Sequence, residues 1–304
     1  MLDALKAAGV TWVRIDPPWG WLERDGKGVY DATRLADVDR CVELTRQRGI
    51  NIIMATHETP GWANNNAGAA APPTNPTDFR DFMQTMAARY RGKVRAWEIW
   101  NEPNNSTFWT GSVGSYVSLL KAGHDGVKAG DSGALVVLGG VMYNDDAYIR
   151  SVYASGGKGY FDVVATHPYQ GVGDEPPEHA DDGNRSWFTH LPAVRRVMAD
   201  YGDLAKPIWL TEFGWSAHAN TSGTPSWAWG VSEAMQADFA VRAIDYAASN
   251  WPYVGMMTWF KERSWSISGS DWFQLHTEGY GLLRADRSQR PVYGALRSRL
   301  TGTG

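Results

Sequence analysis

The 304-residue sequence contains a single cysteine, Cys41, so the chain cannot form a disulfide within itself. It also lacks a basic surplus, because 29 Lys and Arg residues face 33 Asp and Glu residues. We therefore expect no nucleic-acid partner. Its longest apolar runs, such as residues 134–138, are far shorter than the roughly 20 residues of a membrane span, so we expect none. No signal peptide is visible, and both a secreted and a cytoplasmic location stay open.

Sequence motifs for metal and nucleotide chemistry are missing as well. There is no His-Glu-x-x-His motif and no cysteine cluster, and the seven histidines are scattered, which argues against a catalytic zinc site. Neither a P-loop nor a Gly-x-Gly-x-x-Gly motif occurs. The segment at residues 214–218 fails the last position of a Gly-x-Ser-x-Gly nucleophile motif. We expect no metal and no cofactor.

Short runs of β-branched and aromatic residues alternate with helical patterns, which is typical of βα units and a parallel sheet. The expected strands are residues 11–16, 51–57, 95–101, 135–140, 161–167, 207–213 and 253–260. Helical patterns ending at glycine, as at Gly9, Gly49, Gly130 and Gly202, precede several of them, and a last helix is expected near residues 291–300. One helix followed by seven strand and helix pairs predicts a (β/α)8 TIM barrel that lacks its first β-strand in this chain.

The alternative is an open, doubly wound sheet, and the lengths of the connections favour the barrel. The long connections follow strands, as barrel active-site loops do, whereas the links from helix to strand are short. These long connections span residues 57–76, 168–187, 214–231 and 261–290. No linker or composition change marks a boundary, so we expect one domain over residues 1–300 and a disordered tail over 301–304.

A barrel without one strand has two unpaired edges, here on the strands at residues 11–16 and 253–260. We expect the natural protein to carry an N-terminal segment that fills this gap. A monomer is then the expected state, and domain swapping or a dimer is the alternative.

Tryptophan is abundant, with 16 residues, and nine of them fall in or beside the long connections. These nine are Trp19, Trp21, Trp62, Trp109, Trp215, Trp227, Trp229, Trp265 and Trp272. Aromatic rings that line a cleft can bind the apolar faces of sugar rings. Each of these rings can equally serve to pack its own loop.

Two carboxylates fall at the carboxyl ends of expected strands. Strand alternation puts Glu98, Trp100 and Glu102 in one inward row and Ile208, Leu210 and Glu212 in another. Glycoside hydrolysis needs such a pair, one group to protonate the leaving oxygen and the other to attack or to activate water. Arg14 shares the inward parity with Asp16 and can hold an inward carboxylate ionised. A structural ion pair with Glu98 is the alternative for Arg14.

Two expected strand ends carry the segments WEIWNEPN at residues 97–104 and IWLTEFG at residues 208–214. These segments resemble the two catalytic strand ends of clan A glycoside hydrolases, with family 39 the closest match and family 5 next. The resemblance extends to VRID at 13–16, ATHPY at 165–169, TWF at 258–260, YGLL at 280–283 and RPVY at 290–293. Unlike the xylosidase and iduronidase members of family 39, this chain ends soon after its last expected helix, which favours a single-domain enzyme acting on an oligo- or polysaccharide.

The resemblance implies a retaining mechanism with Glu102 as acid/base and Glu212 as nucleophile. It also implies that Asn101 binds the sugar 2-hydroxyl, that His167 or Tyr169 contacts the nucleophile or the ring, and that Trp259 underlies the sugar under attack. Further candidates for substrate binding are Arg14, His57, Trp109 and Trp215. The histidines can instead be satisfied residues above the barrel core.

Two other classes of function stay open at this point. The same scaffold can be a carbohydrate-binding barrel that has lost its activity, and sugar binding without hydrolysis would indicate it. A different barrel enzyme with a metal or base elsewhere would show metal dependence that survives loss of Glu102.

Overall fold

The computed structural model describes residues 1–267, 269 and 271–302. Its strands are β1 Trp12–Ile15, β2 Asn51–Thr56, β3 Ala96–Ile99, β4 Leu135–Leu138, β5 Val141–Met142, β6 Val164–His167, β7 Ile208–Phe213 and β8 Val254–Trp259. Its helices are α1 Leu2–Ala7, α2 Trp19–Leu22, α3 Ala32–Gln47, α4 Pro76–Arg89, α5 Val113–Gly130, α6 Asp146–Ala154, α7 Leu191–Asp200, α8 Glu233–Asn250, α9 Trp272–Gly279 and α10 Pro291–Thr301. No helix in these described ranges has the length and apolar character that crossing a membrane requires.

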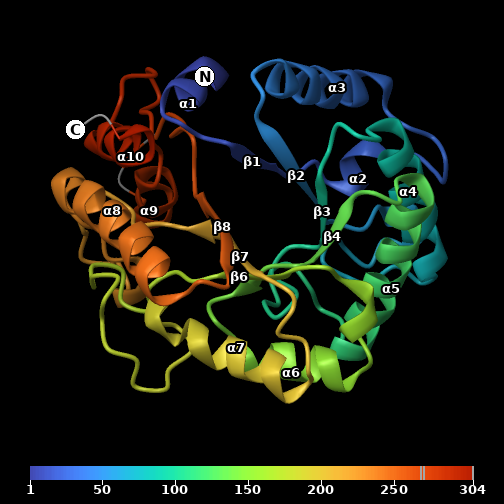
Figure 1. Cartoon of the computed structure of the whole chain (residues 1–304). Helices are drawn as coiled ribbons and strands as arrows, with labels where there is room; N and C mark the ends of the chain where they lie inside the picture. The colour runs from blue at the N-terminus through green and yellow to red at the C-terminus, as the bar shows by residue number, and fades with distance from the viewer. Residues whose placement is uncertain (268, 270, 303–304) are drawn as a thin grey trace.

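The strands are parallel and follow the chain order, as β1-β2-β3-β4 and β5-β6-β7-β8. Only Gly139 and Gly140 separate β4 from β5, and a parallel bridge from Val137 to Val163 continues the sheet between the two groups. β4 and β5 are therefore two parts of one barrel strand. The seven expected strands and the barrel class are confirmed, with helices around the outside of the strands (Figure 1).

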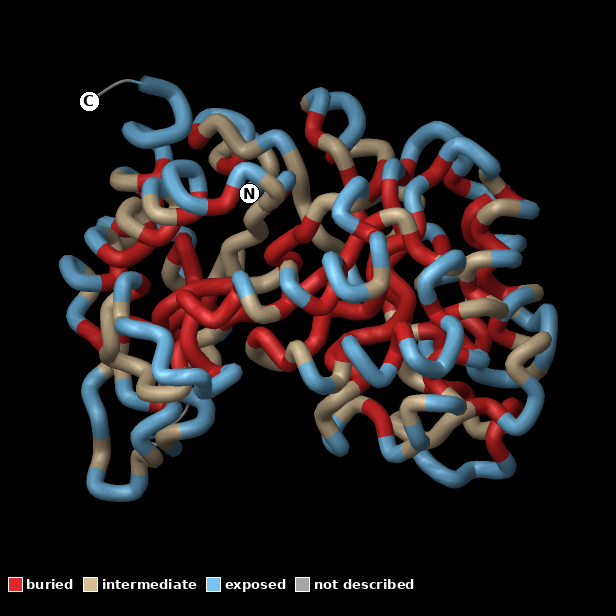
Figure 2. Tube along the Cα trace, turned by 60° about the horizontal axis from the view of Figure 1, so that its bottom comes forward, coloured by how far each residue is buried: buried red, intermediate tan, exposed pale blue. Residues whose placement is uncertain are grey.

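Side chains of alternating parity divide the buried interior into two layers. Residues that point into the barrel form a small core of their own, which is Ile53, Ala96, Val137, Val163, Ala165, Trp209 and Met256, with Trp12 packed against it. The opposite parity, including Trp97 and Ile99, joins the larger core between strands and helices. Buried segments accordingly run through the middle of the molecule while the outer loops are exposed (Figure 2).

The barrel is open between β1 and β8. Within the described residues β1 pairs only with β2, and β8 pairs only with β7. A cavity of about 770 Å³ lies between these strands and is lined mainly by apolar side chains, among them Leu5, Trp12, Ile244, Met256 and Leu296. All four residues of β1 are partly exposed, whereas all four of β3 are buried. The two expected open edges are therefore present, and we refer to this opening as the seam.

Glycines end some helices but not all those expected. Gly9, Gly49 and Gly202 have φ of 80°, 66° and 63°, the left-handed conformation that glycine adopts readily at a helix end. Gly130 was expected to be such a cap, but it is the last residue of α5, where a Cβ would collide with backbone atoms of α4. It serves close helix packing instead.

The chain terminus also differs from the expected tail. Thr301 is the last residue of α10, and Gly302 caps that helix with φ of 68°. Helix α10 therefore ends one residue beyond the expected domain end at residue 300, and residues 303–304 of the expected tail lie outside the described residues. The Tyr293 hydroxyl donates to the carbonyl of Ala4, so α10 lies against α1 (Figure 1).

Candidate active site

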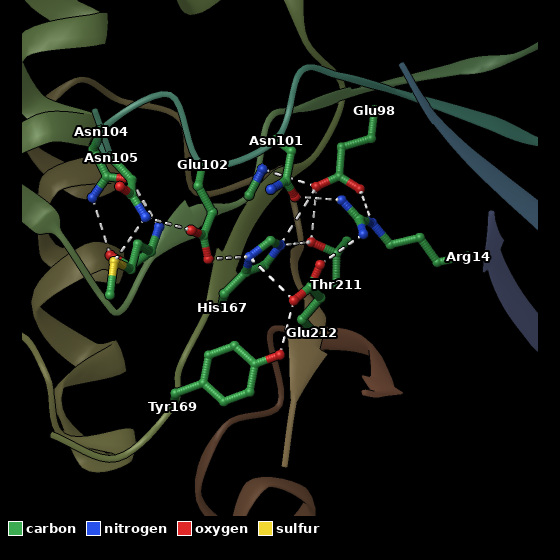
Figure 3. Close-up of polar contacts among 12 residues, drawn as sticks. Arg14, Glu98, Asn101, Glu102, Asn104, Asn105, His167, Tyr169, Thr211 and Glu212 are labelled. Atoms are coloured by element: carbon green, nitrogen blue, oxygen red, sulfur yellow. Dashed lines mark hydrogen bonds and ion pairs between the residues drawn. The ribbon is translucent and has the colours of Figure 1, made fainter. Parts of the chain in front are cut away.

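Glu102 and Glu212 meet at the carboxyl ends of β3 and β7. Glu102 lies three residues beyond the end of β3, and Glu212 is the fifth residue of β7. The ligand atoms of Glu102, His167 and Glu212 all lie within 4.8 Å of one another, so the two carboxylates approach to that distance (Figure 3). Oxygens of the two carboxylates are thus close enough to act on one small group between them.

Left-handed backbone, rather than strand alternation, brings Glu102 into the site. Trp100 and Glu102 have φ of 77° and 40°, conformations that residues with a side chain rarely adopt. Trp100 turns away from the barrel and packs edge-on against Phe79 of α4 and Trp109. The expectation that Glu98, Trp100 and Glu102 form one inward row is therefore wrong at Trp100. Strained backbone of this kind is often found at functional sites.

An irregularity in the pairing of β7 with β8 lies beside Glu212. Ile208 and Leu210 belong to the core between strands and helices, so the inward direction expected for them is wrong. The pairing of β7 with β8 shifts between Leu210 and Phe213. At this register shift Thr211 and Glu212 are adjacent in sequence, and yet both take part in the central hydrogen-bond network.

Arg14 connects three acceptors at the centre of the site. Its Nε donates to Glu98 Oε2 at 2.6 Å, its Nη1 to Glu212 Oε1 at 2.7 Å and its Nη2 to Asn101 Oδ1 at 2.8 Å. The sequence predicted either an ion pair with Glu98 or a contact with another inward carboxylate for Arg14. The structure contains both. Arg14 therefore joins Glu98 and Glu212 through charge-assisted hydrogen bonds.

His167 and Tyr169 complete the surroundings of the two carboxylates. His167 Nδ1 lies 3.0 Å from Glu102 Oε1 and 3.8 Å from Glu212 Oε2, and its Nε2 lies 3.1 Å from Thr211 Oγ1. The Tyr169 hydroxyl donates to Glu212 Oε2 at 2.8 Å. Each oxygen of Glu212 therefore has its own donor, one from Arg14 and one from Tyr169.

Burial and neighbouring charge act in opposite directions on the groups of this network. Burial alone would lower the pKa of His167, but the carboxylates of Glu212, Glu102 and Glu98 outweigh it and raise the value to about 9. For Glu98 burial favours the neutral form, yet Arg14 and His167 lower its pKa to about 2. Burial and the charge of Glu212 raise the pKa of Tyr169, which stays a hydroxyl donor. His167 is therefore a cation at neutral pH.

The spacing of Glu102, His167 and Glu212 would also admit a cation, but their chemistry argues against one. A protonated imidazole has no lone pair to offer a metal, and the pKa of His167 is raised to about 9. Both carboxylates also accept hydrogen bonds from protein donors. The arrangement fits a network that holds protons better than it fits a metal site.

The four other candidate residues have different surroundings. His57 contacts the rings of Trp100 and Phe108 edge-on, and burial lowers its pKa. Trp259 is partly exposed and donates its indole N–H to the Tyr280 carbonyl at 2.8 Å.

Trp109 and Trp215 are buried, at 3% and 2% exposure. Trp109 packs edge-on against Trp100 and Tyr116, and Trp215 packs against Phe188 and Phe239. These two rings support loops and present no open face to a sugar. Among the described tryptophans the exposed ones are Trp21, Trp227, Trp229 and Trp265.

Sequence reasoning missed two neighbours of Glu102. Asn105 Nδ2 donates to Glu102 Oε2 at 3.0 Å, and Gly140 accepts the Glu102 backbone N–H at 2.9 Å. The second asparagine of the Asn104-Asn105 pair, three residues after the acid in a tight turn, was the available signal for the first contact. Gly140 gave no signal, because its role depends on the break between β4 and β5.

A barrel with two carboxylates paired at its strand ends is typical of TIM-barrel glycoside hydrolases. The chain matches the family model described as Cellulase (glycosyl hydrolase family 5) over residues 1–260, and it belongs to that family. The clan A membership that the sequence resemblance implied is therefore confirmed at the level of the family. Family 5 is the second of the two families that the sequence resembles.

Individual relatives are distant. Endoglucanase C of Acetivibrio thermocellus is 23% identical over 159 residues, which cover 50% of this chain and 44% of that protein. A family 39 glycoside hydrolase from Bacteroides cellulosilyticus WH2 superposes with a TM-score of 0.79 at 21% identity, over 99% of this chain and 60% of its own. A GH5_18 variant from Streptomyces cattleya in complex with Manb1-4GlcNAc has a TM-score of 0.76 at 18% identity, over 99% and 73%. The chain thus spans less than two thirds of the first two proteins.

Proposed function

We propose that this protein is a retaining glycosidase that cleaves a β-linked oligo- or polysaccharide by double displacement. Glu212 is the nucleophile and Glu102 the acid/base. The observation that carries the proposal is that their oxygens approach to within 4.8 Å at the carboxyl end of the barrel strands. A retaining pair needs this proximity, since both groups act at one anomeric carbon without an intervening water.

In the first step a Glu212 oxygen attacks the anomeric carbon while the bond from that carbon to the leaving oxygen breaks. Glu102 gives its proton to that oxygen, so the aglycone departs as an alcohol and a glycosyl ester of Glu212 remains. In the second step Glu102 takes a proton from water, whose oxygen attacks the same carbon and releases Glu212 as a carboxylate. Arg14 and Tyr169 stabilise that carboxylate before attack and after release.

Substrate contacts follow from the positions of Asn101 and Trp259. Asn101 uses its amide oxygen to accept from Arg14. Its NH₂ group has no hydrogen-bond acceptor among the described residues and can donate to a sugar hydroxyl beside the nucleophile. Trp259, at the end of β8, offers a partly exposed ring near Phe213 of β7, where it can stack on the sugar under attack. A β-1,4-glucan is the first substrate to test, because the family model carries the description Cellulase.

The test compares Glu102→Ala and Glu212→Ala with Glu43→Ala, which removes an exposed carboxylate of α3. We expect both active-site variants to lose several orders of magnitude in kcat on aryl β-glycosides and glucan oligosaccharides, and the control to keep its turnover. The anomer released by the wild type, followed by NMR, should be the β-anomer. Wild-type turnover in either active-site variant, or release of the α-anomer, would contradict the proposal.

The second candidate is a carbohydrate-binding barrel without activity. The open seam favours it because Arg14 lies on β1, which among the described residues pairs with β2 alone. Calorimetry with cello-oligosaccharides separates the two candidates. Binding with no turnover by the wild type would indicate the second one.

A further inference from the structure

Glu98 is a fully buried carboxylate beneath the two proposed catalytic groups, with 0% of its side chain exposed. It accepts from Arg14 Nε at 2.6 Å, from the Gly140 N–H at 2.8 Å and from the Thr211 hydroxyl at 2.9 Å. His167 Nε2 lies 3.8 Å away. Glu98 therefore cannot contact a substrate, yet its partners extend in both directions towards Glu102 and Glu212 (Figure 3).

One branch of this network leads to the nucleophile. The guanidinium of Arg14 is planar, so its orientation is fixed once Nε is held by Glu98. The two remaining nitrogens then point at Glu212 Oε1 and Asn101 Oδ1, at 2.7 and 2.8 Å. Without Glu98 the guanidinium could rotate about its stem and lose this alignment.

The second branch leads to the acid/base in two ways. The peptide group that precedes Gly140 donates its N–H to Glu98, and the Gly140 carbonyl accepts the backbone N–H of Glu102 at 2.9 Å. Thr211 has one hydroxyl proton and gives it to Glu98, so it accepts from His167 Nε2–H. His167 then donates its Nδ1–H to Glu102 Oε1 at 3.0 Å.

We propose that Glu98 is a positioning residue that aligns Glu212 through Arg14 and Glu102 through Gly140, Thr211 and His167. This inference rests on the proposed roles of Glu102 and Glu212. A fully buried ionised carboxylate is costly for a protein, and an apolar group of similar size often serves stability as well or better. Alignment of both proposed catalytic groups would explain why the protein keeps a buried carboxylate at Glu98.

Glu98→Gln is the direct test, because it keeps the size of the side chain and removes its charge. We expect kcat to fall about 100-fold with KM changed little, since misplacement of catalytic groups by about 1 Å costs this much. Glu23→Gln is the matched control. Glu23 is also buried, at 2% exposure, and accepts from the Trp19 indole and the Gly28 N–H, but it contacts neither proposed catalytic group.

Two kinetic readouts separate positioning from a general loss of structure. Aryl glycosides with poor leaving groups depend on proton donation, whereas those with good leaving groups depend mainly on nucleophilic attack. Because Glu98 serves both branches, we expect the variant to be slow on both kinds of substrate. In the double variant Arg14→Lys/Glu98→Gln, the two losses should be strongly non-additive, because Glu98 acts on Glu212 through Arg14.

The pH profile gives a third readout. Three carboxylates face His167, those of Glu98, Glu102 and Glu212, and Arg14 lies behind Glu98. Removing the charge of Glu98 lowers the pKa of His167, so His167 loses its proton at a lower pH. Because the protonated His167 donates to Glu102, we expect activity to decline at a lower pH on the alkaline side in Glu98→Gln. A merely structural defect would lower the whole profile without moving it.

Turnover of Glu98→Gln equal to that of Glu23→Gln, or additive losses in the double variant, would overturn the proposal. Were Glu98→Gln not to fold, Thr211→Val would take its place, because it removes one donor to Glu98 and the acceptor for His167 at nearly constant size. Wild-type turnover in a folded Thr211→Val would then overturn it. Failure of the catalytic assignment itself is distinguishable, because Glu102→Ala or Glu212→Ala would stay active in that case.

Discussion

The Tyr169 hydroxyl lies 2.8 Å from Glu212 Oε2, and the Arg14 guanidinium lies 2.7 Å from the other oxygen of the same carboxylate. The nucleophile proposed here is therefore held from both sides by donors of different kinds. Burial and the charge of Glu212 raise the pKa of Tyr169, so this donor keeps its proton over the working range of pH. The arrangement makes the contribution of each donor measurable.

Tyr169→Phe removes one of these donors and leaves the ring in place. We expect kcat to fall by about 100-fold, the usual effect of losing one preorganised hydrogen-bond donor at a developing or departing charge. Steady-state kinetics on an aryl β-glycoside measures it. Tyr160→Phe, at a tyrosine in the turn before β6, is the control and should leave kcat unchanged, and an equal loss in both variants would contradict this role for Tyr169.

Stability should depend on pH through His167. Its pKa in the folded protein is about 9 against an ordinary 6.5, so the folded state binds this proton more tightly than the unfolded state. The stabilisation is complete below about pH 6.5 and is lost as pH rises through about 9, up to roughly 3 kcal/mol. Urea unfolding at a series of pH values from 6 to 9.5 tests this expectation. The slope should be smaller in His167→Asn, and an identical slope in the two proteins would rule out His167 as its source.

Gly140→Ala should damage both the fold and the site. A Cβ at this position would collide with His167 Nε2 and with Thr211 Oγ1, two members of the central network. We expect a lower Tm and a large loss of kcat. Gly294→Ala is the control, since nothing lies within 4 Å of a Cβ there and the residue is inside α10, where alanine should stabilise by up to about 1 kcal/mol. Equal Tm values for the two variants would contradict this interpretation.

Asn105→Ala tests the contact that sequence reasoning missed. Its amide donates to Glu102 Oε2 at 3.0 Å, so its loss frees the proposed acid to rotate. We expect a fall of about tenfold in kcat on substrates with poor leaving groups and little change with good ones, as general acid catalysis predicts. A loss of equal size on both would place the effect of Asn105 elsewhere.

The sequence predicted the barrel, its seven strands and the pairing of Glu102 with Glu212, because short apolar runs and strand-end motifs are local patterns. It could not predict how the two carboxylates reach the centre. The positive φ of Trp100 and the register shift near Glu212 both override the alternation of side chains along a strand. Nor could it distinguish the buried rings of Trp109 and Trp215 from exposed platforms, since their surroundings come from distant segments.

The seam has a consequence for the proposed active site. Within the part of the chain that the structure describes, Arg14 belongs to a strand, β1, that hydrogen-bonds to a neighbour on one side only, and yet Arg14 holds Glu98, Asn101 and Glu212 together. The residue that joins all three acceptors thus lies on one of the two edge strands of the barrel. If the proposed function holds, any change that stabilises or destabilises this edge strand should shift Arg14 and so alter the rate of turnover.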